Sequence, residues 1–554
     1  MPPSNDPLSR RGFLAASAGL VAAACSGNDE PATGTGSTAP APPESTTVTQ
    51  PSTTTSTTST TLPVPEFAND PFPFGVASGD PLPDAVVIWT RLAVDPMAPG
   101  AGIDLEQVPV RWEIGPDGDV SVADGEFVTN TAHGHSVHVD VTGLEPSTDY
   151  WYRFHVGDHT VAGMTRTAPA PGASVDSVRL AVASCMAWKS GRFTPLTHLT
   201  QEGADAVIFV GDYIYELESG TFRDHGLPVP YSLDEYRSYY AVARLEPELA
   251  ECHGNVPWIV MWDDHEVEDN YAGWEPGGIG SLLDPTAAAS FRDRRIAAYQ
   301  AWWEFMPVRT GPPVDGELTV YRDFAFGDLV HLALVDDRQY RSPIVQGEGN
   351  GNLPRPFGGG PQLDGAFDES RTMLGVEQEE WLAGQFDNDA RWTIVAQQTI
   401  MAEVNRAPDD PTKGFSMDAW DGYVAPRERL LGAARDAGVE NLVVLGGDIH
   451  TSAVADLHVS YHDPDSPMVG TEFVAPSITS LELLLPEFVE GSRRNEHIHL
   501  YETEHRGYLV VDITADDLTT HFRWVDTTQA PTSPIRTASS WRVTAGTTGV
   551  ERLP

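Results

Sequence analysis

Cysteine is scarce in this chain of 554 residues, which has only Cys25, Cys185 and Cys252. Three cysteines form no disulfide framework. Basic residues are also few, since 34 Lys and Arg stand against 80 Asp and Glu and give a net charge of −46. This charge disfavours polyanions, so we expect no general nucleic-acid-binding surface. Long apolar runs are missing too, and no segment is predicted to span a bilayer as a helix.

The first residues are typical of an exported bacterial protein. Paired arginines precede a short apolar run of small residues, which is the layout of a signal peptide for the twin-arginine route. Cys25 ends this run and resembles the lipidated cysteine of a lipobox, although Ala22 stands where leucine is usual. We therefore expect residues 1–30 to be a twin-arginine signal peptide, followed either by cleavage near Ala24 or by lipidation of Cys25 as a membrane tether. Both outcomes predict export by the twin-arginine machinery to the extracellular side or the cell surface.

Composition and periodicity divide the rest of the chain. Residues 31–70 are rich in Pro, Thr, Ser and Gly and contain too few apolar groups to fold, so they predict a disordered linker. Residues 71–170 contain short alternating apolar stretches between turns, which predict an N-terminal β-sandwich domain. Residues 177–530 alternate apolar runs with helical stretches, which predict one large α/β domain. Residues 531–554 are expected to be a C-terminal tail.

The β-sandwich domain has features of a structural module. The segment that ends at Tyr150 looks like the tyrosine corner of fibronectin type III domains, where the hydroxyl bonds to nearby backbone. The domain also contains His133, His135 and His138. We interpret these histidines as a solvated loop and strand face rather than as a binding site.

In the larger domain, five apolar runs end in polar side chains that are able to bind metal. These side chains are Cys185, then Asp212, then Asp263, Asp264 and His265, then Gln397 and Gln398, and finally Asp448 and His450. Tyr215 adds a phenol three residues after Asp212. Because open α/β sheets build their sites at the carboxyl ends of their strands, we expect these groups to converge on one rim.

The donor types also fit one another. Thiolate, phenolate, carboxylate and imidazole suit a divalent or trivalent metal, and phenolate favours ferric iron in particular. Carboxylate and amide oxygens suit calcium or magnesium beside it. Asp212 is a candidate bridge between two ions, and two-metal sites clamp phosphoryl groups during hydrolysis. His265 is a candidate to protonate the leaving oxygen.

Each motif taken alone also has a structural explanation. Asp212 is equally well placed to cap a following helix, and Cys185 to be a packed core thiol. The segment Asp264-His265-Glu266 is compatible with a solvated turn. The shared position of these residues at strand ends in one domain is what favours a metal site.

A series of ordered motifs resembles the PhoD-like alkaline phosphatase family. These motifs are residues 73–81, Ser184-Cys185, GDYIYE at 211–216, WDDHEVEDNYAG at 262–273, residues 292–309, DDRQYR at 336–341, GGDIH at 446–450 and EFVAPSITS at 472–480. The resemblance covers nearly all of residues 71–530. One minor departure is Asp337, where the family often has threonine.

The resemblance implies an α/β fold in which a metallophosphatase α-β-β-α sandwich is preceded by a small fibronectin-III-like β-sandwich. It also implies kinship with purple acid phosphatases and the use of ferric iron (Fe3+) with calcium (Ca2+). The implied metal ligands are Cys185, Asp212, Tyr215, Asp264, Asp448 and His450, and the implied catalytic residues are Asp212 and His265. Which of Asp263, Asp264 and Asn270 holds the second metal stays open.

We therefore predict an exported alkaline phosphatase that hydrolyses phosphate monoesters or diesters by metal-assisted attack at phosphorus. The alternative is a phosphodiesterase or phospholipase-D-like enzyme that acts on lipid or cell-wall diesters. A third interpretation is a surface adhesin with a structural metal, but such sites are usually closed by protein ligands. In the enzymatic interpretations, the local metal cations offset the acidic protein, so small-molecule, lipid or polymer phosphate esters are able to bind.

Overall fold

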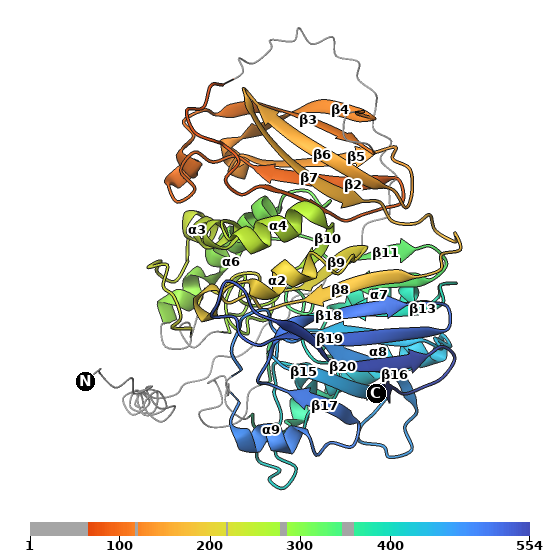
Figure 1. Cartoon of the computed structure of the whole chain (residues 1–554). Helices are drawn as coiled ribbons and strands as arrows, with labels where there is room; N and C mark the ends of the chain where they lie inside the picture. The colour runs from red at the N-terminus through yellow and green to blue at the C-terminus, as the bar shows by residue number, and fades with distance from the viewer. Residues whose placement is uncertain (1–64, 117–119, 218–219, 278–284, 346–358, 483) are drawn as a thin grey trace, which may run out of the picture. The chain divides into compact units, whose positions relative to one another are not determined.

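The structure is a computed structural model (Figure 1). It describes residues 65–116, 120–217, 220–277, 285–345, 359–482 and 484–554. The expected signal peptide and nearly all of the expected linker lie outside these residues, so both stay predictions. Among the helices of the described ranges, none combines the length and the apolar character that a bilayer crossing requires.

The N-terminal domain is a sandwich of two antiparallel layers, the first of which is the end of a ten-stranded sheet that continues into the larger domain. One contains β1 (Val76–Gly79), β2 (Ala85–Arg91) and β5 (Ser136–Thr142). The other has the order β4-β3-β6-β7, formed by β3 (Gln107–Gly115), β4 (Ala123–Asn130), β6 (Asp149–Val156) and β7 (His159–Arg166). Tyr150 Oη accepts a hydrogen bond from the backbone N–H of Glu145 at 2.9 Å, so the predicted tyrosine corner is confirmed.

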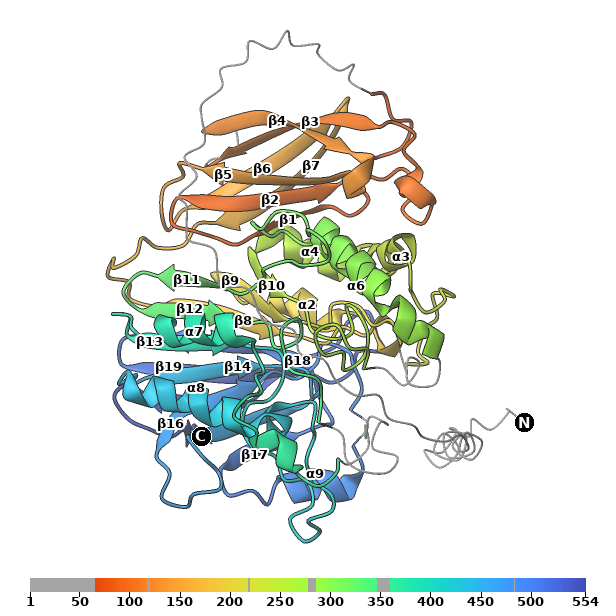
Figure 2. The same ribbon diagram turned by 180° about the vertical axis from the view of Figure 1, so that it is seen from behind.

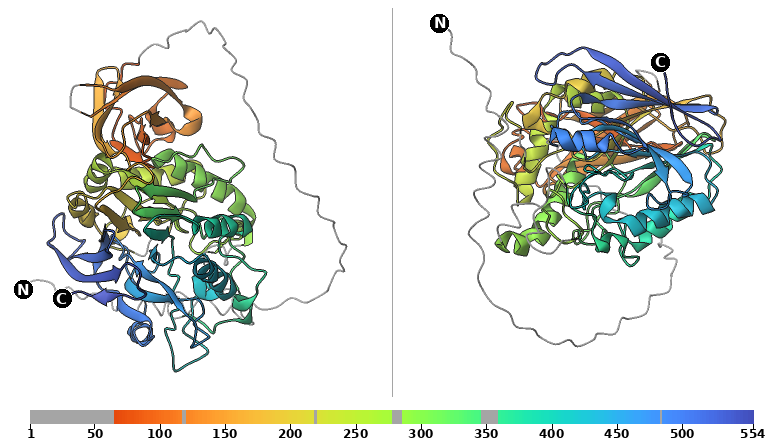
Figure 3. Two further views of the ribbon diagram at one scale, coloured as in Figure 1. Left: turned by 90° about the vertical axis from the view of Figure 1, so that its right-hand side faces the viewer. Right: turned by 90° about the horizontal axis from the view of Figure 1, so that it is seen from below.

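The larger domain consists of two sheets (Figure 1, Figure 2 and Figure 3). The ten-stranded sheet has the order β21-β20-β19-β18-β8-β9-β10-β1-β2-β5. Its further strands are β8 (Val178–Ala183), β9 (Ala206–Val210), β10 (Trp258–Met261), β18 (Arg506–Ile513), β19 (Asp517–Val525), β20 (Ile535–Thr544) and β21 (Glu551–Arg552).

The seven-stranded sheet has the order β11-β12-β13-β14-β16-β15-β17. Its strands are β11 (Arg322–Phe326), β12 (Val330–Leu334), β13 (Trp392–Ala396), β14 (Leu442–Gly446), β15 (Ser452–His458), β16 (Met468–Val474) and β17 (Ile498–Glu502). The helices are α2 (Thr194–Leu199), α3 (Leu233–Arg244), α4 (Pro247–Asn255), α6 (Pro285–Phe305), α7 (Val376–Gln385), α8 (Val424–Asp436) and α9 (Pro486–Ser492).

Alternation along the central strands explains the layering. Leu180 and Val182 of β8 belong to an apolar core with β12 and β13 of the other sheet. Ala181 and Ala183 instead belong to a second core with α2, α3, α4 and α6. A third core joins β13 and β14 to α7 and α8. Both faces of the central strands are therefore buried, which explains their near-continuous apolar runs and confirms the α-β-β-α sandwich.

The N-terminal sandwich shares a sheet with the larger domain. Strand β1 pairs in parallel with β10 through Gly79 and Trp258. Asp80 follows β1 and accepts hydrogen bonds from the Arg322 guanidinium, at 3.1 Å from Nε and 2.6 Å from Nη2. Arg322 Nη2 also donates to the carbonyl of Val260 in β10 at 2.9 Å. The end of β1 is thereby tied to the strand that precedes Asp263.

Two expectations need correction. Residues 531–554 were expected to be a tail, but they include β20 and β21, which extend the ten-stranded sheet. Trp541 and Val543 of β20 are buried in the core between the sheets, so this segment is an integral part of the large domain.

The second correction concerns the histidines of the N-terminal domain, which are not a solvated face. The side chain of His135 has 0% exposure. His138 Nε2 lies 3.1 Å from the carbonyl oxygen of Trp303 and 2.9 Å from that of Met306, so this nitrogen carries the proton. The His138 ring also stacks on Trp303. The His133 ring also lies 5.1 Å from that of Trp303, so both β5, which carries His138, and the loop before it pack against the end of α6.

Candidate metal centre

The predicted ligands lie at the carboxyl ends of strands from both sheets. Cys185 follows β8, Asp212 and Tyr215 follow β9, Asp264 and His265 follow β10, and Asp448 and His450 follow β14. A bridge between Ser184 and Ser477 joins the ends of β8 and β16 beside them. The structure thus brings four of the five predicted strand ends together.

One group of donors gathers around Tyr215. Cys185, Asp212 and His450 each offer a ligand atom, and these three atoms lie within 4.8 Å of one another. Tyr215 Oη lies 2.7 Å from Asp212 Oδ2 and 2.8 Å from His450 Nε2. A thiol, a carboxyl, a phenol and an imidazole therefore face a common point.

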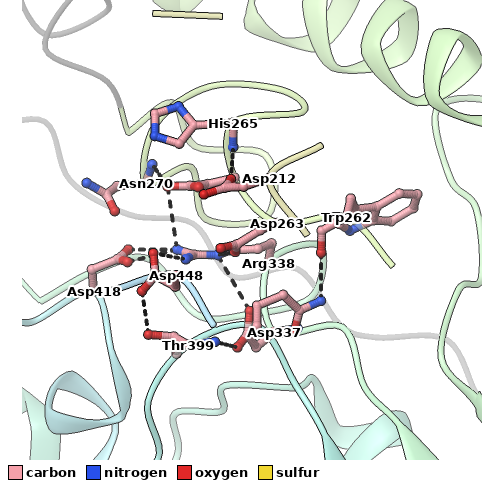
Figure 4. Close-up of polar contacts among 12 residues, drawn as sticks. Asp212, Trp262, Asp263, His265, Asn270, Asp337, Arg338, Thr399, Asp418 and Asp448 are labelled. Atoms are coloured by element: carbon pink, nitrogen blue, oxygen red, sulfur yellow. Dashed lines mark hydrogen bonds and ion pairs between the residues drawn. The ribbon is translucent and has the colours of Figure 1, made fainter. Parts of the chain in front are cut away.

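Carboxylates form most of two further groups, of which Figure 4 labels Asp212, Asp263, His265 and Asp448. Asp212, Asp264 and His265 have ligand atoms within 4.8 Å of one another, and so do Asp263, Asp264 and Asp448. Asp212 belongs to the first and second groups, and Asp264 to the second and third. Asp212 thus lies between two clusters of donors, as a bridging carboxylate must.

These donors fit cations because buried oxygens are left without partners. Asp263 Oδ2 and Asp264 Oδ1 are buried and have no hydrogen-bond partner among the described residues. A buried carboxylate is costly unless it is paired or coordinates a metal. Asp264 Oδ2 already accepts the backbone N–H of Asn270 at 2.6 Å, so Oδ1 is the oxygen left for an ion.

The backbone at the donors has an unusual conformation. Cys185, Asp212, Asn270, Asp448 and His450 have φ values of 62°, 61°, 59°, 62° and 51°. Non-glycine residues in this left-handed region cost of order 1–3 kcal/mol each and cluster at functional sites. Surrounding groups must therefore hold these turns.

Glu266 is one such group. Its carboxylate accepts the backbone N–H of Asp212 at 3.1 Å, of Tyr213 at 2.6 Å and of Asp263 at 2.9 Å. One buried side chain thus clamps the turn after β9 to the turn after β10. Glu266 was part of the WDDHEVEDNYAG motif, but spacing alone gave no sign of this role.

The segment after β16 clamps the turn at Cys185. The carbonyl oxygen of Cys185 accepts the backbone N–H of Thr479 at 3.2 Å and that of Ser480 at 3.3 Å. It also accepts the Ser480 hydroxyl at 2.9 Å. The EFVAPSITS motif therefore positions the thiol rather than supplying a ligand to the groups described above.

Burial dominates the electrostatics of these side chains. It raises the pKa of Asp212, and neighbouring carboxylates add to the increase although His265 opposes it. It likewise raises the pKa of Cys185 and of Tyr215, with the Asp212 carboxylate adding to both. Burial also raises the pKa of Asp448 to about 6. Bound cations would reverse these shifts, because they favour the deprotonated donors.

The two histidines of the centre differ. Burial lowers the pKa of His450 to about 3, so its imidazole is neutral and free to coordinate. Burial lowers the pKa of His265 too, but the carboxylates of Glu216, Asp264 and Asp212 outweigh it and raise the pKa well above its usual value. His450 thus has the neutral state that a ligand needs, and the Glu216 carboxylate favours the protonated form of His265.

Sequence reasoning missed Arg338 and Asp418. Arg338 is fully buried and donates from Nε to Asp263, while its Nη1 lies 2.8 Å from Asp418 Oδ2. Its Nη2 lies 3.4 Å from Asp448 Oδ1 (Figure 4). Arg338 was quoted only as part of DDRQYR, although its place after the apolar β12 was an available signal. Asp418 follows no apolar strand and belongs to no motif quoted above.

The fifth predicted strand end has a supporting role. Gln398 follows β13, donates from Nε2 to the carbonyl of Trp262 at 2.9 Å and accepts the Asp337 backbone N–H at 3.2 Å. The neighbouring Thr399 hydroxyl donates to Asp448 Oδ2 at 2.6 Å. This strand end braces the turns that carry the carboxylates, and Gln398 belongs to none of the donor groups.

An α-β-β-α sandwich with thiol, phenol, acid and imidazole donors at its strand ends defines a metallophosphatase. The chain matches the PhoD-like phosphatase family over residues 180–522 and the N-terminal domain of that family over residues 56–169. The chain therefore belongs to the PhoD-like phosphatase family and is a phosphoric ester hydrolase.

Individual relatives agree with this assignment. Alkaline phosphatase D of Bacillus subtilis (strain 168) is 36% identical over 504 residues, which are 88% of this chain and 83% of the relative. A solved structure described as "Structure of PhoD" matches with a TM-score of 0.80 and 36% identity, covering 88% of this chain and 93% of that one. Purple acid phosphatase 23 of Arabidopsis thaliana is 29% identical over 157 residues, which are 26% of this chain and 33% of the relative.

Proposed function

We propose that this protein is an exported alkaline phosphatase that uses Fe3+ and Ca2+ to hydrolyse phosphate esters. The observation that carries the proposal is the meeting of Cys185, Asp212, Tyr215 and His450 at one point, with further carboxylates beside it. The first relative named above carries the name alkaline phosphatase D, which supports the substrate class.

Iron would be held by Cys185, Asp212, Tyr215 and His450. Thiolate and phenolate are anionic donors that stabilise the ferric state, and His450 adds a neutral imidazole. Calcium would be held by oxygen donors of Asp212, Asp264 and Asp448, in line with its preference for carboxylates. Of the three candidates for the second metal, Asp264 is best supported, because its buried Oδ1 has no hydrogen-bond partner among the described residues and it belongs to two of the donor groups.

When bound, the metals would supply the positive charge that polarises the phosphoryl oxygens and activates the attacking oxygen. Two side chains of the protein, Asp212 and His265, have further roles. Asp212 spans the two donor clusters and fixes their separation. His265 has a side chain that is 15% exposed, so its ring remains accessible to a bound ester and donates a proton to the leaving oxygen.

Phosphodiesters, including lipid or cell-wall diesters cleaved in a phospholipase-D-like manner, are the second candidate substrates. Two exposed apolar residues beside the centre favour them: Leu217 is 53% exposed next to Glu216, and Leu481 is 44% exposed. The Leu481 carbonyl lies 3.0 Å from His450 Nδ1, which places its backbone against a donor. An apolar rim suits the second ester group of a diester. Parallel rates on nitrophenyl phosphate and bis-nitrophenyl phosphate separate the two classes.

Export is a further part of the proposal. The paired arginines and small-residue run of residues 1–30 support the twin-arginine route, which carries folded proteins and so suits an enzyme that loads its metals first. Lipidation at Cys25 would tether the enzyme to the cell surface. The mass of the mature N-terminus distinguishes a lipidated cysteine from an unmodified end.

Elemental analysis combined with optical absorption tests the metal assignment. We expect iron and calcium in one sample, with a tyrosinate-to-iron charge-transfer band. Asp212→Asn should lose metal and nearly all hydrolysis, whereas Asp410→Asn, at an exposed pair with Lys413, should keep both. Full activity and metal content in Asp212→Asn would show that the site assignment is wrong.

A further inference from the structure

We propose that Glu216 is a positioning residue that orients His265 for proton donation to the leaving oxygen. The inference rests on the proposed function and assigns a role to the last residue of the GDYIYE motif. Glu216 is 3% exposed and lies immediately before the exposed Leu217. Burying a carboxylate costs free energy unless it is paired, and the contacts of Glu216 provide that pairing.

Both carboxylate oxygens of Glu216 are engaged. Oε2 lies 2.6 Å from His265 Nδ1, and Oε1 accepts the backbone N–H of Asp269 at 2.7 Å. Because each oxygen has its own donor, the carboxylate is held against rotation. A carboxylate only accepts, so His265 Nδ1 is the donor and its hydrogen points toward Glu216.

The rest of the ring is held as well. The Tyr215 ring packs against the His265 ring with centroids 4.2 Å apart. The His265 backbone N–H lies 3.4 Å from Asp212 Oδ1. Nδ1 is committed to Glu216, whereas Nε2 lies 4.0 Å from Asp269 Oδ1, beyond hydrogen-bond distance, so Nε2 is the nitrogen left to exchange a proton with a bound ester. In other hydrolases, a further side chain likewise orients the group that transfers the proton.

The reaction step is balanced as follows. A water oxygen forms a bond to phosphorus and releases one proton to solvent. The bond between phosphorus and the ester oxygen breaks, and its electron pair stays on the leaving oxygen. That oxygen takes the Nε2 proton of His265, so the products are an alcohol and phosphate, and solvent reprotonates the ring. Proton donation matters most when the leaving alkoxide is strongly basic.

The test compares esters with good and poor leaving groups. We expect Glu216→Gln to lower kcat about 100-fold on phenyl or alkyl phosphate but only a few-fold on dinitrophenyl phosphate, since general acid catalysis contributes roughly 100-fold or more. His265→Asn should show the same leaving-group pattern, and the double variant should lose little more. Glu113→Gln is the matched control, because Glu113 also faces a histidine, His155, at 3.0 Å, in the N-terminal domain.

Two further measurements separate positioning from folding and from metal binding. Iron and calcium content should equal that of the wild type in Glu216→Gln, and NMR of isotope-labelled histidine should show loss of the strongly hydrogen-bonded Nδ1 proton. Glu216→Asp, which keeps a carboxylate, should recover part of the lost rate on phenyl phosphate. It also serves as the second variant if Glu216→Gln does not fold.

Three outcomes would overturn the proposal. Equal losses on all leaving groups would assign Glu216 a merely structural role. Reduced metal content in Glu216→Gln would mean that His265 is a ligand that Glu216 orients. Unchanged rates would remove any role in the reaction. A wild-type protein that binds the metals but hydrolyses none of the esters would instead refute the proposed function.

Discussion

Arg338 donates from Nε to Asp263 beneath the candidate metal centre, and both side chains are fully buried. The same guanidinium reaches Asp418 and Asp448, so one cation joins loops that are far apart in the sequence. In the metal-free protein, Arg338 partly neutralises carboxylates that would otherwise repel one another. This relationship predicts that stability and metal binding are coupled at this residue.

Replacing Arg338 by Met should destabilise the metal-free protein strongly. The variant leaves Asp263 and its neighbours buried without their cation, and breaking a buried ion pair costs about 3–5 kcal/mol. Calcium should recover part of the loss, because a ligand that binds only the folded state stabilises it. Urea unfolding with a chelator and with excess calcium measures both effects.

Arg429→Met is the control for this prediction. Arg429 is 43% exposed and pairs with Glu379 at 2.7 Å, away from the centre. An exposed pair of this kind is worth about 1 kcal/mol or less, and calcium should not change it. If Arg338→Met unfolds at the same urea concentration as the wild type, Arg338 does not balance the charge of the cluster.

The sequence predicted the loops of the centre well because its donors directly follow apolar strands. Asp212 and Asp448 are examples, since each lies within two residues of its strand's end. Asp418 was not predicted because it belongs to an irregular loop, where no periodicity indicates that its side chain reaches the centre. The role of Arg338 was not predicted, because a motif shows that a residue is present but not which carboxylates its side chain contacts.

For the fold too, the sequence predicted what local patterns determine and missed what depends on contacts between distant residues. Alternation and turns predicted the N-terminal sandwich, since both are local patterns. The pairing of Gly79 with Trp258 is parallel and lies between residues far apart in sequence, so local patterns did not reveal the shared sheet. The alternating pattern of strand β20 lies beyond the last motif of the resemblance, so the motifs did not predict that this strand belongs to the large sheet.

Ser480→Ala should weaken the clamp on Cys185. The variant removes the hydroxyl that donates to the Cys185 carbonyl at 2.9 Å and that accepts the Ala187 backbone N–H at 3.2 Å. We expect a loss of about 1–2 kcal/mol in the free energy of unfolding. Iron affinity should fall about 10-fold, as for other residues that orient metal ligands.

Chelator competition, followed by the charge-transfer absorption, measures the change in iron affinity. Ser136→Ala is the control, because its hydroxyl bonds to the His133 carbonyl at 2.9 Å in the N-terminal domain. The control should lose similar stability without a change in iron affinity. Unchanged iron affinity in Ser480→Ala would contradict a positioning role for the clamp.

Asp80→Asn should destabilise both domains together. Asp80 is buried and accepts the Arg322 guanidinium and the backbone N–H of Arg309, the latter at 2.8 Å. We expect a loss of about 2 kcal/mol, the scale of hydrogen bonds to a charged group. Calorimetry should show a single transition at a lower temperature, because the shared sheet couples the domains. Two separate transitions would show that the N-terminal sandwich unfolds independently.

His135 should make the protein less stable in acid. Burial, helped by the positive charge of Arg91, lowers the pKa of His135 to about 4 in the folded protein. In the unfolded chain its pKa is about 6.5, so below that pH the unfolded state binds the proton more readily. The free energy of unfolding should therefore fall as the pH is lowered from about 6.5 toward about 4.

His135→Asn isolates this effect, because asparagine cannot take up the proton and tolerates the φ of 57° at this position. Between about pH 7 and about pH 4.5, urea unfolding of the metal-free wild type should lose about 2 kcal/mol more stability than this variant loses. The comparison cancels the titration of the carboxylates, which the two proteins share. Parallel stability profiles would mean that His135 is able to accept a proton in the folded protein, for which the loop against α6 would have to open.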